Sequence, residues 1–222
     1  MKDMEKKYKL TEETISINGK TLYRIEALRD FSYVRQGDKG GFIEDESNLS
    51  QSGNCWVYGD AKVYGDARVY DNARVYGNAR AFGNARVRGN ARVFGYSEIF
   101  GNARVFDKAK VYGNAEIFDD VKIYDDAKIY GLAWVYRNAE VCGSAEVCGD
   151  AKVESNGDYI VFKNWWSSGR YFTWTKSNDM WKVGCFYGTG EELIEKAYKD
   201  SELSGREYER VVKYVESILK FQ

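Results

Sequence analysis

The sequence predicts a mainly β protein: a long β-solenoid, a β-hairpin cap before it and a small α+β module after it. The solenoid is predicted by the hexad V-Y-G-[DN]-A-[KR], which repeats almost without interruption from Val57 to Val153. A Gly-Asn or Gly-Asp pair closes many of the repeats, so each short strand turns before it can pair with its sequence neighbour. Such a unit buries its apolar face only when many copies stack.

Two columns of side chains set the phase of the repeat. Val or Ile recurs every six residues, with Ala81 as the one small substitute, and a mostly Ala column follows four residues later. Both columns are expected to point inward, as stacking requires. We therefore predict three regions: an N-terminal hairpin and cap over 1–50, the β-helix over 51–155, and a C-terminal module over 156–222.

The two columns resemble those of hexapeptide-repeat proteins, in which three hexads form one coil of a left-handed parallel β-helix. This resemblance implies a triangular prism. With an aliphatic residue in each of its successive hexads, the repeat corresponds to about six coils, or roughly 28 Å at the usual strand spacing.

The N-terminal region predicts a hairpin that closes the first coil. Two alternating runs between Thr14 and Ala27 flank Asn18-Gly19, which favours a type I′ turn. A cap of this kind shields strand edges that would otherwise recruit another chain. The following segments, D-F-S-Y-V-R-Q-G-D-K-G-G-F-I from Asp30 and L-S-Q-S-G-N-C-W from Leu49, resemble YdcK-type β-helix proteins of bacteria, phages and prophages. That resemblance implies a capped prism and no particular activity.

The C-terminal region predicts a βββαα module. Its expected strands cover Tyr159–Lys163, Tyr171–Thr175 and Met180–Phe186. Thr189 is the expected N-cap of a helix that runs through Tyr198, and Ser204 the expected N-cap of a second, amphipathic helix. Because so short a module can build only a small core, we expect it to pack against the last coil or against another subunit.

Composition disfavours several classes of function. The net charge is -1, which gives no electrostatic basis for bulk nucleic-acid binding, although the early coils are about +5 and the late coils about -5. The chain has four cysteines without ligand spacing and no histidine, so we expect no metal, no cofactor, and no histidine-based acyltransferase or carbonic anhydrase chemistry. Unpaired thiols and the lack of a signal peptide or long apolar run predict a cytoplasmic protein.

Two sets of residues are candidates for binding. The first set, in the C-terminal module, combines cations, aromatic rings and hydroxyls that suit a phosphate or nucleotide: Trp166, Arg170, Thr173, Trp174, Lys176 and Thr189. The second set forms aromatic and basic ladders along the prism that suit an oligomer or partner interface: Tyr58, Tyr76, Phe94, Tyr112, Tyr130, Arg68, Arg86 and Arg104. A purely structural role remains the alternative for both, and a stacking groove for single-stranded nucleic acid ranks lower because acidic corners oppose phosphate.

These observations favour a non-catalytic binding or scaffold protein, encoded by a phage or prophage by resemblance, that sequesters a host protein or a small anionic ligand. That setting suggests a counter-defence role, such as inhibiting a host nuclease or trapping a nucleotide signal. An acyltransferase-like enzyme acting on a sugar or nucleotide-sugar is one alternative, and a self-assembling structural protein is another. We expect no membrane partner, and a homo-oligomer, a trimer or a dimer.

Overall fold

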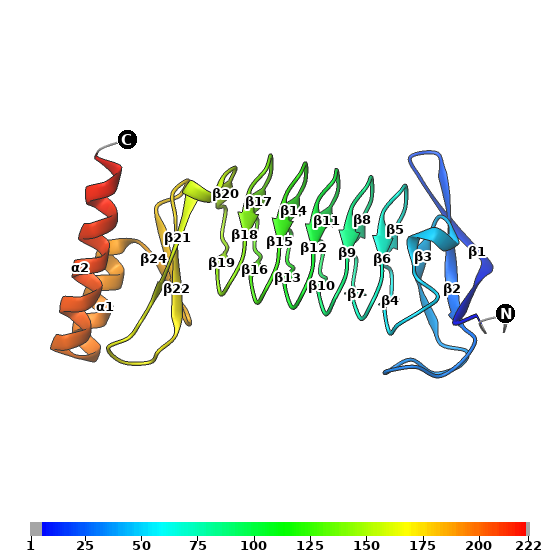
Figure 1. The fold of residues 1–222 in the computed structure, drawn as a ribbon, viewed down its shortest axis with the longest axis horizontal. Coiled ribbons are helices and arrows are strands. Elements are labelled where there is room, and N and C mark those ends of the chain that lie inside the picture. Colours follow the sequence, from blue (N-terminus) through cyan, green and yellow to red (C-terminus); the bar gives the residue numbers. More distant parts are fainter. Residues whose placement is uncertain (1–5, 221–222) are drawn as a thin grey trace.

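The computed structural model describes residues 6–220, which form an elongated rod (Figure 1). A β-hairpin and its neighbouring strand close the N-terminal end. The solenoid forms the middle, and a four-stranded antiparallel sheet with two helices covers the other end. The mainly β fold with a parallel solenoid, predicted from the hexad, is confirmed.

The solenoid consists of two-residue strands that pair in parallel with the strand 18 residues later. Arg92 pairs with Lys110, and Val93 with Val111. This register makes three hexads per coil and produces three sheets, which we call the first, second and third faces. The first face contains β3 (Lys39–Ile43), β5 (Lys62–Val63), β8 (Arg80–Ala81), β11 (Glu98–Ile99), β14 (Glu116–Ile117), β17 (Trp134–Val135) and β20 (Lys152–Val153). The second contains β4 (Trp56–Val57), β7 (Arg74–Val75), β10 (Arg92–Val93), β13 (Lys110–Val111), β16 (Lys128–Ile129) and β19 (Glu146–Val147). The third contains β6 (Arg68–Val69), β9 (Arg86–Val87), β12 (Arg104–Val105), β15 (Lys122–Ile123) and β18 (Glu140–Val141).

The two inward columns form one continuous core. Residues such as Val93, Ile117 and Ala115 are completely buried, and Ser97 occupies the Ala column by donating its hydroxyl to the Phe94 carbonyl at 2.9 Å. In every coil before the last, the N–H of the first strand residue donates to a carbonyl of the following coil, as Arg92 does to Ala109 at 2.9 Å, so each coil is a template for its neighbour. The outward side chains of successive coils are therefore held in register along each face.

The N-terminal cap continues the first face beyond the prism. β1 (Tyr8–Ile17) and β2 (Lys20–Ala27) form a hairpin whose turn residues, Asn18 and Gly19, have φ of 51° and 77°. These positive values confirm the predicted type I′ geometry. The first strand begins at Tyr8, six residues earlier than the sequence pattern indicated. β2 pairs antiparallel with β3, which in turn pairs in parallel with β5.

Two buried polar side chains complete the closure of the first coil. Asn48, at the end of the short 3₁₀ helix η1 (Glu46–Asn48), donates to the carbonyls of Gly65 and Ala67 at 2.8 and 2.9 Å. Its side-chain oxygen accepts from the N–H groups of Glu44 and Asp45. The fully buried Lys7 donates to the Cys55 carbonyl at 3.0 Å, and burial lowers the pKa of this ammonium group. Backbone groups at the prism end therefore have side-chain partners instead of water.

The C-terminal module begins with the 3₁₀ helix η2 (Asn156–Asp158), followed by β21 (Tyr159–Lys163), β22 (Tyr171–Thr175), β23 (Met180–Val183) and β24 (Phe186–Gly188). The prediction of one strand over Met180–Phe186 is wrong. Gly184 adopts φ of 55° and turns the chain, so the segment forms a hairpin and the sheet has four strands. The additional strand depends on this tight turn, which an alternating pattern does not reveal.

Two helices cover the outer side of this sheet, α1 (Gly190–Asp200) and α2 (Glu202–Leu219) (Figure 1). Thr189 is the N-cap of α1, as predicted. The second N-cap is Ser201 and not Ser204, because Ser201 is extended and its hydroxyl accepts from the Ser204 N–H at 3.1 Å. The apolar side of β22 faces the helices, and Thr173 on its other side contacts the last coil.

Candidate functional site

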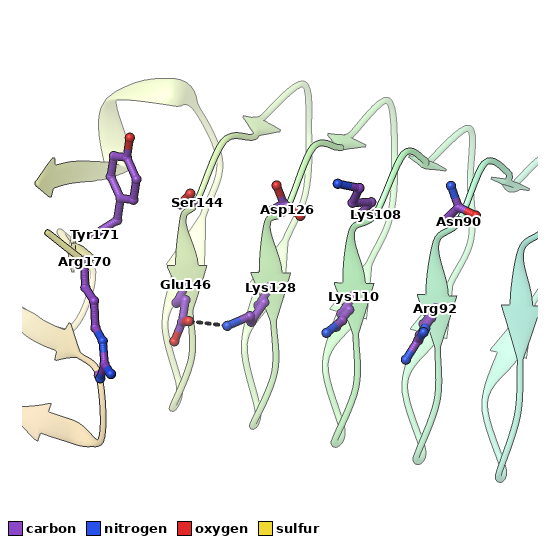
Figure 2. A pocket seen from close by; sticks show the side chains of 11 residues that line it. Asn90, Arg92, Lys108, Lys110, Asp126, Lys128, Ser144, Glu146, Arg170 and Tyr171 are labelled. Atoms are coloured by element: carbon purple, nitrogen blue, oxygen red, sulfur yellow. Dashed lines mark hydrogen bonds and ion pairs between the residues drawn. The ribbon is translucent and has the colours of Figure 1, made fainter.

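An open groove of about 840 Å³ lies where the second face meets the C-terminal sheet (Figure 2). Its walls come from four coils, from Arg170 and Tyr171 at the beginning of β22, and from Gly184 in the turn between β23 and β24. We call it the basic groove, lined by Asn90, Arg92, Lys108, Lys110, Asp126, Lys128, Ser144, Glu146, Arg170, Tyr171 and Gly184. The coil register aligns these side chains, although they are far apart in sequence.

The prism contributes two parallel rows to the groove. The strand row lies on the strands of the second face and consists of Arg92, Lys110, Lys128 and Glu146 (Figure 2). The corner row lies on the turns before these strands and consists of Asn90, Lys108, Asp126 and Ser144. Each step along a row is one coil, about 4.8 Å. Because the register is fixed by backbone hydrogen bonds, three cations of the strand row are held at this short spacing.

The charges in the groove are only partly compensated. Lys128 forms an ion pair with Glu146 at 2.6 Å. Within residues 6–220, the charged groups of Arg92, Lys108, Lys110 and Arg170 have no carboxylate at ion-pair distance. Like charges held this close repel one another, so an anion that enters the groove relieves the repulsion.

Arg170 closes the C-terminal end of the groove, beyond Glu146 at the end of the strand row (Figure 2). The backbone that presents it is anchored: its N–H donates to the Ser168 hydroxyl, and its carbonyl accepts from the Asn164 N–H at 2.8 Å. The buried Asn164 side chain in turn donates to the Tyr208 hydroxyl of α2 at 2.8 Å. The guanidinium is therefore carried by a supported loop and is exposed to solvent.

Thr173 and Trp174, two of the predicted binding residues, are buried. The Thr173 hydroxyl accepts the Glu146 N–H at 2.9 Å and so attaches the sheet to the last coil. The Trp174 ring belongs to the helix-facing core, and its indole N–H donates to Asp179 at 2.7 Å. Neither side chain offers surface to a ligand.

The other predicted binding residues lie in different places. Trp166 packs edge-on against Tyr208, with ring centroids 4.9 Å apart. Thr189 has its hydroxyl engaged by the Glu192 N–H, while the Glu192 carboxylate accepts the Thr189 N–H, so this helix N-terminus already holds an anion. Lys176 lines a separate open groove beside η2. Of the six candidates, Arg170 alone lines the basic groove.

The predicted aromatic ladder is present, but its rings cover one another. Tyr76, Phe94, Tyr112 and Tyr130 stack face to face at 4.7 to 4.8 Å, nearly parallel, and Tyr58 begins the same column one coil earlier. These rings present mainly their edges. On the third face, Arg68, Arg86 and Arg104 stand in register and are exposed. The interface role of both ladders stays a prediction.

Comparison with known proteins bears on the solenoid. The YdcK β-solenoid repeat matches residues 67–82. The Escherichia coli (strain K12) protein named "Uncharacterized acetyltransferase YdcK" is 38% identical over 61 residues. The solenoid is YdcK-like. The matched stretch is 24% of this chain and only 19% of that relative, so the relative's named activity is not thereby an activity of this chain.

Sequence reasoning did not identify the cations that the YdcK-like solenoid contributes to the groove. Arg92, Lys110 and Lys128 are spaced by 18 residues, and this period could have grouped them on one face. The contribution of Arg170 to the same groove depends on how the C-terminal sheet docks. The repeat in the sequence does not predict how that sheet docks.

No group of three or more His, Cys, Asp or Glu side chains in residues 6–220 is arranged to hold a metal ion. Across the same residues, no helix has both the length and the apolar character needed to cross a membrane.

Proposed function

We propose that this protein is a non-catalytic binding protein that holds an anionic ligand in the basic groove. The observation that carries the proposal is the set of four cations, Arg92, Lys108, Lys110 and Arg170, that line one groove without carboxylate ion-pair partners in the described chain. The solenoid acts as a rigid scaffold that fixes their spacing, and the C-terminal module supplies the closing arginine. In a phage or prophage, the setting that the N-terminal motif resembles, such a protein would sequester an anionic host component.

The second candidate is an acyltransferase, which the name of the Escherichia coli relative favours. Acetyl-coenzyme A is itself an anionic ligand that suits the basic groove. The chain has no histidine to act as general base, and the carboxylates in the groove are Asp126 and Glu146. Glu146 is held by Lys128, so Asp126 is the base that this alternative requires.

The proposal is tested with inorganic tripolyphosphate, a probe that carries only anionic charge. We expect saturable binding in calorimetric titrations at low salt. The substitutions Lys110→Ala and Arg170→Ala should each weaken binding about tenfold, since each removes a charge-assisted contact. Arg86→Ala on the third face is the matched control and should leave binding nearly unchanged.

The enzyme alternative is tested with acetyl-coenzyme A and a thiol-release assay over a panel of amino sugars. Thiol release that depends on an acceptor and is lost in Asp126→Asn would replace the binding proposal with the enzyme. Tripolyphosphate binding that is absent, or equally reduced by the control substitution, would refute the groove as the site.

A further inference from the structure

We propose that the second face is a binding track for a short single strand of nucleic acid, which runs from Tyr33 near the cap to Arg170 in the C-terminal module. This inference rests on the proposed function and specifies its ligand. Its first basis is the continuity of two hollows. A smaller hollow of about 300 Å³, lined by Tyr33, Tyr58, Arg74, Tyr76 and Arg92, shares Arg92 with the basic groove.

The second basis is the line of cations along this track. Arg74, Arg92 and Lys110 follow one another on adjacent strands of the second face. In the described chain, none of the three has an ion-pair partner, whereas Arg80 on the first face is paired with Glu98. Cations at regular intervals along a groove are suited to following a phosphate backbone.

The third basis is the lack of acidic residues at the corners that line the central part of the track, where carboxylates would repel phosphate. The groove-lining corner residue two positions before Arg92 is Asn90, and the one before Lys110 is Lys108. Acidic lining begins only with Asp126 and Glu146, and Glu146 is neutralised by Lys128. The central part of the track is therefore free of lining carboxylates.

The fourth basis favours nucleic acid over an acidic peptide. Exposed aromatic rings stand at both ends of the track: Tyr33 is 77% exposed and Tyr171 is 49% exposed. The Arg74 guanidinium lies 4.9 Å from the centre of the Tyr33 ring and supports it from one side. A base can stack on such a ring while its phosphates meet the neighbouring cations, whereas a chain of carboxylates gains nothing from the ring faces.

The dimensions indicate a short ligand. From Arg74 to Glu146 the track advances four coils, about 19 Å at the usual strand spacing. This length suits roughly four nucleotides, the lower end of known single-strand site sizes. With the four unpaired cations of the basic groove in contact with phosphates, the slope of log K against log salt should be about −3.

The test is fluorescence anisotropy with a labelled oligo-dT of about ten nucleotides, beside a labelled oligo-glutamate of similar charge. We expect the oligonucleotide to bind more tightly, and to bind about 50-fold more weakly when salt is raised fourfold. Tyr33→Ala should weaken oligonucleotide binding at least about fivefold and leave tripolyphosphate binding unchanged. Because Tyr33 is exposed, this substitution should not disturb folding, which circular dichroism checks.

The control is the pair Arg86→Ala and Arg104→Ala, which removes two unpaired, exposed cations from the third face. It should change oligonucleotide binding much less than Arg92→Ala with Lys110→Ala. Equal effects from the two pairs would overturn the track, as would oligo-glutamate binding as tightly as oligo-dT. If tripolyphosphate binds and oligo-dT binds no better, this inference fails while the proposed function stands; if neither binds, both fail.

Discussion

Gly113 offers a quantitative test of how closely the coils stack. It lies in a column of glycines at the edge between the second and first faces, with φ of 73°. A Cβ atom at this position would lie 2.9 Å from the Gly131 nitrogen and 3.1 Å from the Gly131 oxygen, both backbone atoms of the next coil. We expect Gly113→Ala to lower the free energy of unfolding by about 2 to 5 kcal/mol, from the left-handed backbone and the overpacking together.

Gly143 and Gly59 separate these two contributions. Both have positive φ, 64° and 60°, but a Cβ at Gly143 would meet nothing within 4 Å, and one at Gly59 would come no closer than 3.8 Å. Alanine at either position should therefore cost only the backbone term, about 1 to 2 kcal/mol. The two controls lie towards opposite ends of the prism, so fraying of one end would not affect both.

Aspartate at position 113 should be tolerated better than alanine, although it is larger. Asp119 and Asp125 occupy the equivalent position at other edges with φ of 61° and 57°. Their carboxylates accept the N–H of Arg137 and Gly143 on the next coil, each at 3.0 Å. The same bond in Gly113→Asp should recover about 1 kcal/mol relative to Gly113→Ala.

The assay is urea unfolding followed by far-ultraviolet circular dichroism, with the slope against urea compared to confirm that each variant unfolds in the same way. Equal losses for Gly113→Ala and the two controls would show that coil contact does not limit this position. A larger loss for Gly113→Asp than for Gly113→Ala would refute the role assigned to the corner carboxylates.

Three further predictions concern the caps and the ladders. Asn48→Ala should cost about 3 kcal/mol or more in urea unfolding because it orphans buried backbone groups, whereas Asn84→Ala, on the exposed edge, should cost less than about 0.5 kcal/mol. Burial raises the pKa of Tyr76 above its usual value of 10. The contribution of Tyr76 to stability is therefore complete below pH 10 and is lost as the pH rises towards the folded-state pKa. Tyr76→Phe should flatten the fall in melting temperature above pH 10. Thr173→Val should cost about 1 kcal/mol and release the C-terminal sheet first, seen as faster amide hydrogen exchange in β22 than in the coils; uniform exchange would contradict this attachment.

The aromatic ladder was predicted from the sequence in its positions but not in the orientation of its rings. The hexad period correctly placed Tyr76, Phe94 and Tyr112 in one column, and the 18-residue coil also explains Arg88, which interrupts the aromatic column of the third face. Its guanidinium lies 4.6 Å from the centre of the Phe106 ring, so the column continues through a cation–π contact. The sequence did not show that the stacked rings cover their own faces, because ring orientation depends on the coil spacing.

The candidate site was predicted only in part. Arg170 was predicted to bind a ligand and lines the basic groove, but Thr173 and Trp174, chosen from the same motif, alternate to opposite sides of β22 and are both buried. Strand alternation predicts that they diverge, but which surfaces cover each side is decided by how the sheet docks on the prism and how the helices pack on it.

The sequence by itself determined the solenoid, because a coil's register follows from a local repeat: Val and Ala at fixed positions bury only when identical units stack. It also determined the hairpin turn at Asn18-Gly19 and the N-cap at Thr189, which are local features of the backbone. Only the tertiary structure decided that Arg170 meets Arg92, Lys108 and Lys110 in one groove. That meeting depends on a single contact surface between the last coil and a non-repeating module. No periodicity records such a surface, since it arises from the shape of two packed parts and not from the order of residues within either.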